Sequence, residues 1–354
     1  MHLLSLFLLL FSFVSNIQVS NVNDYYARSY IVMDYNSGKV LEEKNKDLVR
    51  SVASISKLMT AYVALTYYED INDIVTIGDE IDKAYGSAVY LDKGETLTLE
   101  ELLYALLLRS GNDAALSIAY FVGNKDISFF VSMMNNEARK LGMHNSLFRN
   151  PCGLDEEDGG NLSTSFDMAI LMRKCLDLPL FCKIVSSPSY QSSNHGVWQN
   201  KNKLINRYKY TTGGKTGFTR LAKRTLVTSA KKESTHLIVV TLDCGSDFAF
   251  HQALYEKHFS IYENRVLLKQ GNKRIDQYIV KIDKDINYIL KKEEWNKTLL
   301  IYKVEKNKKE MDIYLLIDNE ERYLSSLEII EVYKENHKIS SWDRFIKLLK
   351  NLFK

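Results

Sequence analysis

The stretch that decides the fold is SVASISKLMTAYVALTYY, residues 51–68. Apolar side chains recur in it at helical spacing and predict a helix with one buried face. Ser54 and Lys57 lie three positions apart, so they share one side of that helix, with Cβ atoms about 5–6 Å apart. A desolvated lysine amine can take the proton of a serine hydroxyl. The pair therefore predicts a nucleophile, Ser54, and its general base, Lys57, in a first helical turn whose dipole favours negative charge.

Two further short motifs follow in order, Ser110-Gly111-Asn112 and Lys215-Thr216-Gly217. Taken alone, each has an ordinary structural explanation, because Ser and Asn cap helices and Lys-Thr-Gly can end an exposed strand. A second S-x-x-K at Ser229–Lys232 shows how easily such short patterns arise, and we interpret it as accidental. The three motifs together, in this order, are the signature of β-lactamases and penicillin-binding proteins.

The chain resembles the low-molecular-mass penicillin-binding proteins, which are serine D-alanyl-D-alanine carboxypeptidases (peptidase family S11). The resemblance covers most of residues 25–265 and is carried by four stretches: Met33–Asn45, Gly94–Ala115, Asn150–Ser165 and Lys215–Ala230. Within the last stretch, the run KTGFTRLAKRTLVT is similar to the sporulation-associated branch of the family. The resemblance implies an α/β fold of the DD-peptidase/β-lactamase type, in which helices flank an antiparallel sheet.

The resemblance also implies a reaction. The substrate would be a peptidoglycan stem peptide ending in D-Ala-D-Ala, and β-lactams would acylate the same serine. Ser54 would attack the penultimate carbonyl with Lys57 as base, and D-alanine would leave after Ser110 relays a proton to its nitrogen. The backbone N–H groups of Ser54 and Phe218 would form the oxyanion hole. Neither a cofactor nor a metal ion is implied.

The remaining motif residues would bind the substrate. Asn112 would hydrogen-bond the substrate backbone and the Lys57 region. Lys215 and Thr216 would bind the free terminal carboxylate, which explains selectivity for carboxypeptidase over endopeptidase cleavage. Gly217 lacks a side chain, so the peptide could lie close against its strand as an added β-strand.

One stretch departs from the family pattern. Where many relatives have Ala-Gly after the Lys-Thr-Gly segment, this chain has Ala222-Lys223-Arg224. The two cations either add anion binding near the cleft or are simply solvated, and solvation is the commoner case. We therefore leave both residues out of the predicted site.

Composition limits the other possibilities. With 354 residues and 45% hydrophobic side chains, the chain can bury a sizeable core and is expected to form two domains. A net charge of +3 gives no general case for nucleic-acid binding. The 4 cysteines show neither C-x-x-C spacing nor a metal-ligand pattern with the 7 histidines. We expect free, buried thiols.

Four parts are predicted along the chain: a signal peptide or hydrophobic segment (1–22), a catalytic domain (23–265), a small all-β domain (266–335) and an amphipathic helix (336–354). The first part has a short apolar run typical of a secretory signal, and its alternative is a buried strand or helix. The last part is basic, with aromatic residues on its apolar face, which favours a membrane-surface anchor over a helix docked on the protein's own core. We therefore expect an exported protein, peripheral to the outer face of the cytoplasmic membrane.

Secondary structure follows from periodicity. In the catalytic part we expect a hairpin at 30–42, short strands near 74–77 and 97–99, strands at 215–219, 225–230 and 236–242, and helices at 51–68, 99–108, 114–121, 127–141, 165–176 and 248–262. In the second domain, short alternating strands are expected at 278–282, 286–290, 299–304, 311–317 and 327–332.

Two other functions remain open at this point. A β-lactamase shares all three motifs and in one class needs an acidic residue in the loop between the second and third, where Glu156 and Glu157 stand. The extra β domain and membrane helix have no use in a freely secreted β-lactamase. A non-catalytic cell-wall-binding protein could keep the same fold, but the intact Ser54–Lys57 pair argues against that hypothesis.

Overall fold

The computed structural model describes residues 25–155, 159–305 and 309–333. The predicted N-terminal segment, the predicted C-terminal helix, and Glu156 and Glu157 lie outside this range. The chain divides into two compact units, Met1–Ser260 and Ile261–Lys354, a little before the predicted boundary at residue 265. Among the described residues, no helix is both long and apolar enough to cross a membrane.

The first unit is built on a five-stranded antiparallel sheet in the order β2-β1-β11-β10-β9. Its strands are β1 (Ser29–Asp34), β2 (Val40–Lys44), β9 (Thr211–Thr219), β10 (Lys223–Lys232) and β11 (Thr235–Leu242). Side chains on one face, such as Val227 and Val240, join the main apolar core. On the opposite face, Thr228 and Thr241 contact His251 of α8 (Asp247–Ile261). Successive side chains point to opposite faces because a strand is pleated, and both faces of this sheet are covered.

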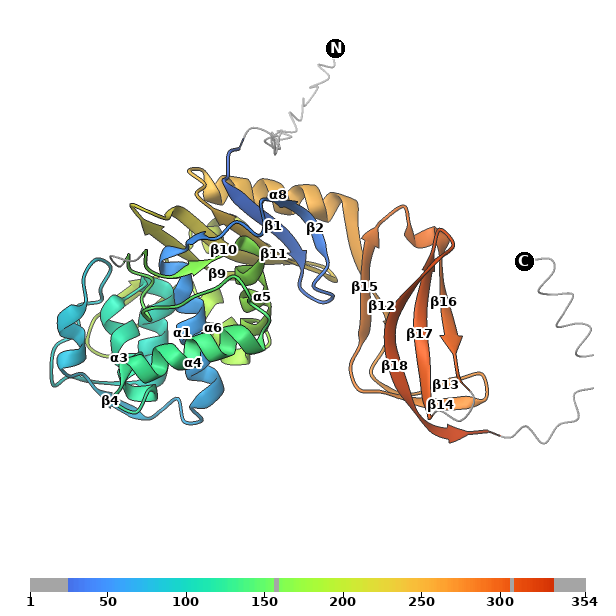
Figure 1. The fold of residues 1–354 in the computed structure, drawn as a ribbon, viewed down its shortest axis with the longest axis horizontal. Helices are drawn as coiled ribbons and strands as arrows, with labels where there is room; N and C mark the ends of the chain where they lie inside the picture. Colours follow the sequence, from blue (N-terminus) through green and yellow to red (C-terminus); the bar gives the residue numbers. More distant parts are fainter. Residues whose placement is uncertain (1–24, 156–158, 306–308, 334–354) are drawn as a thin grey trace, which may run out of the picture. The chain divides into compact units, whose positions relative to one another are not determined.

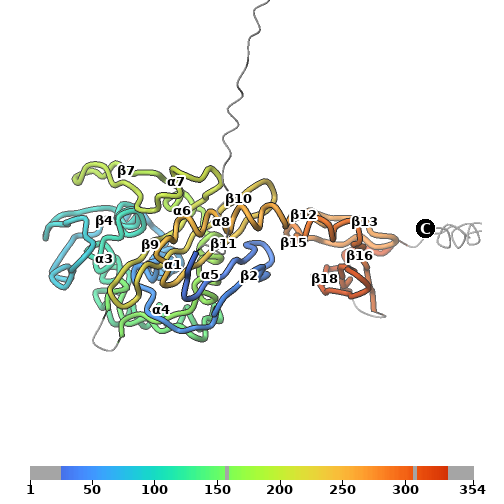
Figure 2. The backbone as a smooth tube through the Cα atoms, turned by 90° about the horizontal axis from the view of Figure 1, so that it is seen from above, coloured from blue at the N-terminus to red at the C-terminus, as the bar shows by residue number. Residues whose placement is uncertain are grey.

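Helices cover both faces of this sheet, with α8 along one side and most of the others on the other side (Figure 1). They are α1 (Lys57–Tyr67), α2 (Leu99–Tyr104), α3 (Asn112–Val122), α4 (Ile127–Lys140), α5 (Ser165–Cys175), α6 (Pro179–Ser186) and α7 (Leu204–Arg207). Figure 2 shows β7 (Ser189–Gln191) and α7 on the opposite side of this unit from α4. The predicted fold class is thus confirmed.

Short elements connect the helices: η2 (Ala53–Ser56), η3 (Asp79–Lys83), η4 (Ala105–Arg109), the pair β3 (Arg50–Ser51) and β6 (Leu162–Ser163), the pair β4 (Ile74–Thr76) and β5 (Thr96–Thr98), and the pair β7 and β8 (Val197–Gln199). The hairpin β7–β8 and the helices α6 and α7 were not predicted. The four cysteines are free in the structure, three of them buried.

The predicted helix at 51–68 is wrong in its first turn. Residues Ala53–Ser56 form a 3-10 turn, and the α-helix begins at Lys57. The cause lies just before it, where β3 pairs with β6 and Ala53 adopts a left-handed backbone with φ of 52°. A non-glycine residue in that conformation cannot continue an α-helix, so the chain enters the helix through a tighter turn.

The second unit is all-β apart from the short turn η5 (Trp295–Lys297) in its described residues. Its main sheet has the order β13-β14-β18-β17-β16, and β12 pairs with β15 separately. The strands are β12 (Tyr262–Leu268), β13 (Gly271–Ile275), β14 (Tyr278–Ile282), β15 (Ile286–Lys291), β16 (Thr298–Lys303), β17 (Glu310–Ile317) and β18 (Glu320–Val332). Strand β17 alternates strictly, with Met311, Ile313, Leu315 and Ile317 buried.

Candidate active site

Ser54 is presented by the strained turn η2. Its neighbour Ala53 is left-handed, and the Val52 N–H is held by the Asn161 carbonyl at 3.2 Å. Gly153 lies against this turn so closely that a Cβ there would be 2.0 Å from the Ala53 oxygen. The segment around Gly153 therefore braces the backbone that carries Ser54, and no larger residue fits at this position without displacing it.

Lys57 is fully buried, and its amine lies among three oxygens. Nζ is 3.1 Å from Ser54 Oγ, 2.6 Å from Asn112 Oδ1 and 2.5 Å from the Cys152 carbonyl oxygen. Burial lowers the pKa of Lys57 to about 8, and the positive charge of Lys201 acts in the same direction. A neutral amine has two N–H groups, which Asn112 and Cys152 accept, and one lone pair, which is left for the Ser54 hydroxyl proton.

The second motif joins this centre from the end of α2 and η4. Ser110 closes that helical segment in a left-handed conformation with φ of 63°, and Asn112 begins α3. Asn112 accepts from Lys57 through Oδ1 and donates to the Tyr85 carbonyl through Nδ2. Its own N–H donates to the Ser87 carbonyl at 2.7 Å. Asn112 therefore fixes both the base and the segment at 85–87.

The third motif lies on β9, the edge strand of the sheet. A Cβ on Gly217 would be 2.4 Å from Thr225 Oγ1 and 3.1 Å from the backbone nitrogen of Ser54. The strand thus approaches the nucleophile turn so closely that a side chain at Gly217 would have to displace one of them. This approach brings the backbone after Gly217 near the Ser54 N–H.

Lys215 occupies a different position from the one expected of a carboxylate-binding group. It is 1% exposed, and its Nζ donates to the Thr216 carbonyl at 2.7 Å. Burial lowers the pKa of Lys215 well below its usual value, and the charges of Lys57 and Lys201 lower it further.

A cavity of about 280 Å³ opens over these residues. Its lining contains Ser54, Ser87, Ser110, Lys201, Lys203, Thr216, Gly217, Phe218, Arg224, Asp247 and Phe248. Five predicted site residues thus line one cavity, and the three motifs meet there. The other three predicted residues, Lys57, Asn112 and Lys215, are buried and do not line it.

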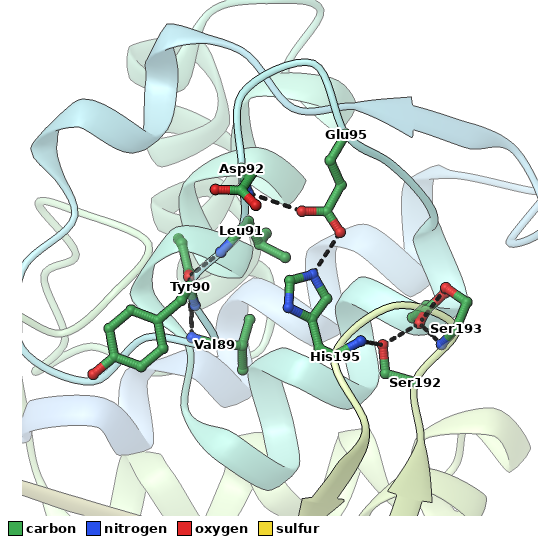
Figure 3. A network of polar contacts seen from close by, with 10 residues as sticks. Val89, Tyr90, Leu91, Asp92, Glu95, Ser192, Ser193 and His195 are labelled. Atoms are coloured by element: carbon green, nitrogen blue, oxygen red, sulfur yellow. Dashed lines mark hydrogen bonds and ion pairs between the residues drawn. The ribbon is translucent and has the colours of Figure 1, made fainter.

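A polar network holds the segment that follows Ser87 in the cavity wall, and Figure 3 shows it around residues 89–95 and His195. The Asp113 carboxylate accepts hydrogen bonds from the backbone N–H groups of Val89, Tyr90 and Leu91, which begin two residues after Ser87. Farther along, Glu95 contacts His195 Nε2 at 2.5 Å and so ties the turn between β7 and β8 to this wall. Asp113, which follows Asn112 in α3, therefore also anchors this wall to that helix.

Several residues that contribute to the site were not predicted from the sequence. Lys201 donates to Ser87 Oγ at 3.0 Å, and burial followed by the charge of Arg109 lowers the pKa of Lys201. It lies in the segment between α6 and α7, where no periodic pattern gives a signal. Cys152 acts through its backbone carbonyl, which every residue type possesses, so only its place in a glycine-containing stretch could have pointed to it. Among the described residues, no group of His, Cys, Asp and Glu side chains could hold a metal ion.

Comparison with known proteins decides the family. A family model described as D-alanyl-D-alanine carboxypeptidase matches residues 16–246. The chain belongs to this family. It is 31% identical over 290 residues to the D-alanyl-D-alanine carboxypeptidase DacF of Bacillus subtilis, covering 76% of this chain and 73% of the relative. It is 33% identical over 219 residues to DacB2 of Mycobacterium tuberculosis, covering 61% of this chain and 74% of the relative.

A solved structure extends the likeness beyond the catalytic unit. Penicillin binding protein 5 from Haemophilus influenzae superposes with a TM-score of 0.76 at 25% sequence identity, over 87% of this chain and 97% of that one. The predicted family is therefore confirmed, and with it the serine D-alanyl-D-alanine carboxypeptidase activity. The roles of individual residues remain predictions.

Proposed function

We propose that Ser54 forms the acyl-enzyme and that Lys57 is its general base. The observation that carries this proposal is the Lys57 amine, buried, with a pKa of about 8, 3.1 Å from Ser54 Oγ. The neutral amine takes the hydroxyl proton as Oγ attacks the penultimate carbonyl of a peptide ending in D-Ala-D-Ala. The acyl group passes to Ser54, D-alanine leaves, and water then hydrolyses the ester.

Charge that develops on the carbonyl oxygen needs donors close to Ser54. The N–H groups of Ser54 and Phe218 are our candidates, and the tight approach of Gly217 to the Ser54 nitrogen supports them. Ser110 lines the same cavity, so its hydroxyl is our candidate for delivering a proton to the leaving nitrogen.

Substrate binding is assigned to the strand β9. Thr216 and Gly217 line the cavity, so the peptide can lie along this exposed edge as an added strand. Lys215, buried on the face of β9 that carries Gly217, contributes positive charge to this end of the cavity when protonated. Asn112 was expected to hydrogen-bond the substrate backbone, but it is buried with both ends of its amide engaged, so its role is to hold the Lys57 amine.

We further propose that the enzyme works on stem peptides of peptidoglycan outside the cytoplasm and is acylated by β-lactams. Support for export and for membrane-surface attachment comes from the apolar run within 1–22 and the basic amphipathic pattern of 336–354. Nucleic acid is not among the proposed partners, because the net charge is only +3.

Two measurements on the intact chain test the central proposal. Release of D-alanine from a pentapeptide is expected from the unmodified chain and is abolished by Ser54→Ala. A fluorescent penicillin should label one serine, which peptide mass mapping identifies as Ser54. Ser229→Ala, in the second S-x-x-K on β10, is the matched control and should keep both activities. A folded chain that neither releases D-alanine nor is labelled would contradict the proposal, and a penicilloyl-enzyme that hydrolyses within seconds would indicate a β-lactamase instead.

A further inference from the structure

The cations that line the cavity differ from the one predicted to bind the substrate carboxylate. Lys215 is 1% exposed, and its amine is engaged by a backbone carbonyl. The lining instead contains Lys201, Lys203 and Arg224. Since a free carboxylate must meet an accessible donor, one of these three is the better candidate for direct contact.

Arg224 combines accessibility with a fixed position. Its side chain is 43% exposed, yet its Nη2 donates to Asp247 Oδ1 at 2.8 Å, and Asp247 is only 3% exposed. The Asp247 carboxylate is itself held by the Phe248 N–H at 2.8 Å, and the Phe248 ring lies 5.6 Å from the guanidinium carbon. A guanidinium that is oriented in this way loses little freedom when it binds a second anion. Lys201, by contrast, has its amine bound to Ser87.

The register of the sheet brings Arg224 to the active end of β9. Arg224 pairs with Phe218 across β9 and β10, directly after the Lys-Thr-Gly motif. Cross-strand partners point to the same face, so Arg224 and Phe218 share the face that α8 covers, where Arg224 contacts Asp247. All of these residues line the same cavity as Ser54.

Arg224 also retains hydrogen-bond donors and positive charge that Asp247 does not use. Asp247 occupies Nη2, and Nε is buried with no hydrogen-bond partner in the described part of the chain, so a second anion has to approach the exposed remainder of the guanidinium. Lys203 acts on the same carboxylate, since its charge tends to lower the pKa of Asp247, although burial raises that pKa overall. Two cations facing one carboxylate leave this end of the cavity positive, so a second carboxylate is attracted there.

We propose that Arg224, oriented by Asp247, binds the free carboxylate of the terminal residue of the substrate. This inference rests on the proposed function and deepens it, because it assigns the carboxylate to a residue outside the three motifs. Arg224 is a substrate-binding and specificity residue in this proposal, while Lys215 stays buried.

The test uses binding rather than turnover, so that it stands apart from the test of the proposed function. Two peptides that end in D-Ala-D-Ala, one with a free carboxylate and one with a terminal carboxamide, are titrated calorimetrically into the Ser54→Ala chain. Adding Arg224→Gln should weaken binding of the carboxylate peptide about 10- to 100-fold, as expected for loss of a charge-assisted hydrogen bond. The carboxamide peptide should change less than about twofold by the same reasoning. Arg220→Gln, the same chemical change at an exposed turn residue outside the cavity, should alter neither peptide.

Two further variants test whether Arg224→Gln weakens binding by disturbing the structure instead of by removing a contact with the carboxylate. Arg224→Lys keeps the charge but not the planar fork, so it should recover part of the preference for the carboxylate peptide. The double variant Arg224→Gln/Asp247→Asn leaves no unpaired carboxylate, and its thermal midpoint shows whether the fold is intact. The proposal is overturned if Arg224→Gln weakens both peptides equally or leaves the preference unchanged. Absence of D-alanine release from the unmodified chain would count against the proposed function and would leave this binding result standing.

Discussion

The two units of the chain bury different side chains. In the first unit, Lys57, Asn112 and Lys215 are 0%, 2% and 1% exposed. In the second, the buried side chains among the described residues are apolar, apart from Asn264. Removing an amine from water is costly unless oxygens surround it, and three surround Lys57. The first unit thus contains buried amines that stability alone would not favour, and one of them, Lys57, lies beside Ser54.

A core built by simple alternation and a core built around buried amines should respond differently to substitution. In the second unit a lost side chain should reduce stability and leave chemistry intact. In the first, substitution near Ser54 should reduce acylation far more than stability would suggest. Substitutions in each unit, compared by their effects on acylation and on stability, test that difference.

Lys57→Ala should give the largest loss. It removes the base and leaves Asn112 Oδ1 without the hydrogen bond at 2.6 Å. Loss of a general base typically costs about 10²- to 10⁴-fold in rate, so the second-order rate constant of acylation by a fluorescent penicillin should fall within that range. Lys232→Ala, the lysine of the second S-x-x-K, is the matched control. A Lys57→Ala chain that is acylated at the normal rate would exclude Lys57 as the base.

Gly217→Ala should have the next largest effect. Its Cβ would meet Thr225 Oγ1 at 2.4 Å and the Ser54 nitrogen at 3.1 Å, so the strand or the nucleophile turn must shift. Disturbing one oxyanion-hole donor typically costs about 10²- to 10³-fold, and stopped-flow acylation should show a loss up to that size. Gly245→Ala is the control, since a Cβ at Gly245 meets nothing within 4 Å. Equal rates for the two variants would mean that this close contact has no part in catalysis.

The pH dependence of acylation should reveal the lowered pKa of Lys57. The base is active when neutral, so the rate should rise with pH and level off above a midpoint near about 8. Lys201 is one cause of the lowered pKa, because its charge disfavours protonation of Lys57. Lys201→Gln should therefore raise the pKa of Lys57 and move the midpoint to higher pH, with Arg220→Gln as control. A midpoint that moves to lower pH would contradict this sign.

Much of the fold could be predicted because its signals are local. Alternation located the main sheet strands of the first unit and five strands of the second, but not β12 or β13, and helical spacing located α3, α4, α5 and α8 within a few residues. The 3-10 turn at Ser54 could not be predicted, because it depends on the left-handed Ala53 and on the pairing of β3 with β6, more than a hundred residues apart. Tertiary contacts override helical periodicity at this position.

The residues of the candidate site also divide into those with a local sequence signal and those without one. Short motifs of distinctive chemistry led to eight predicted site residues, five of which line the cavity. Contributors that act through a backbone carbonyl, such as Cys152, carry no residue-type signal. Arg224 was noticed as a departure, but its pairing with Asp247 depends on the packing of α8 against the sheet, which no local pattern encodes.

Ile313→Ala in the second unit should have the smallest effect on acylation and a clear effect on stability. Ile313 is 0% exposed at the centre of β17, and truncating such a side chain to Ala typically costs about 2–5 kcal/mol of unfolding free energy. Leu299→Ala, on the neighbouring strand β16 and 63% exposed, should cost far less. Thermal unfolding should therefore separate the two variants, while fluorescent-penicillin acylation of both stays at the rate of the unmodified chain. A fall in acylation with Ile313→Ala under conditions where the first unit remains folded would show that the second unit supports the chemistry, and the contrast between the two cores would then fail.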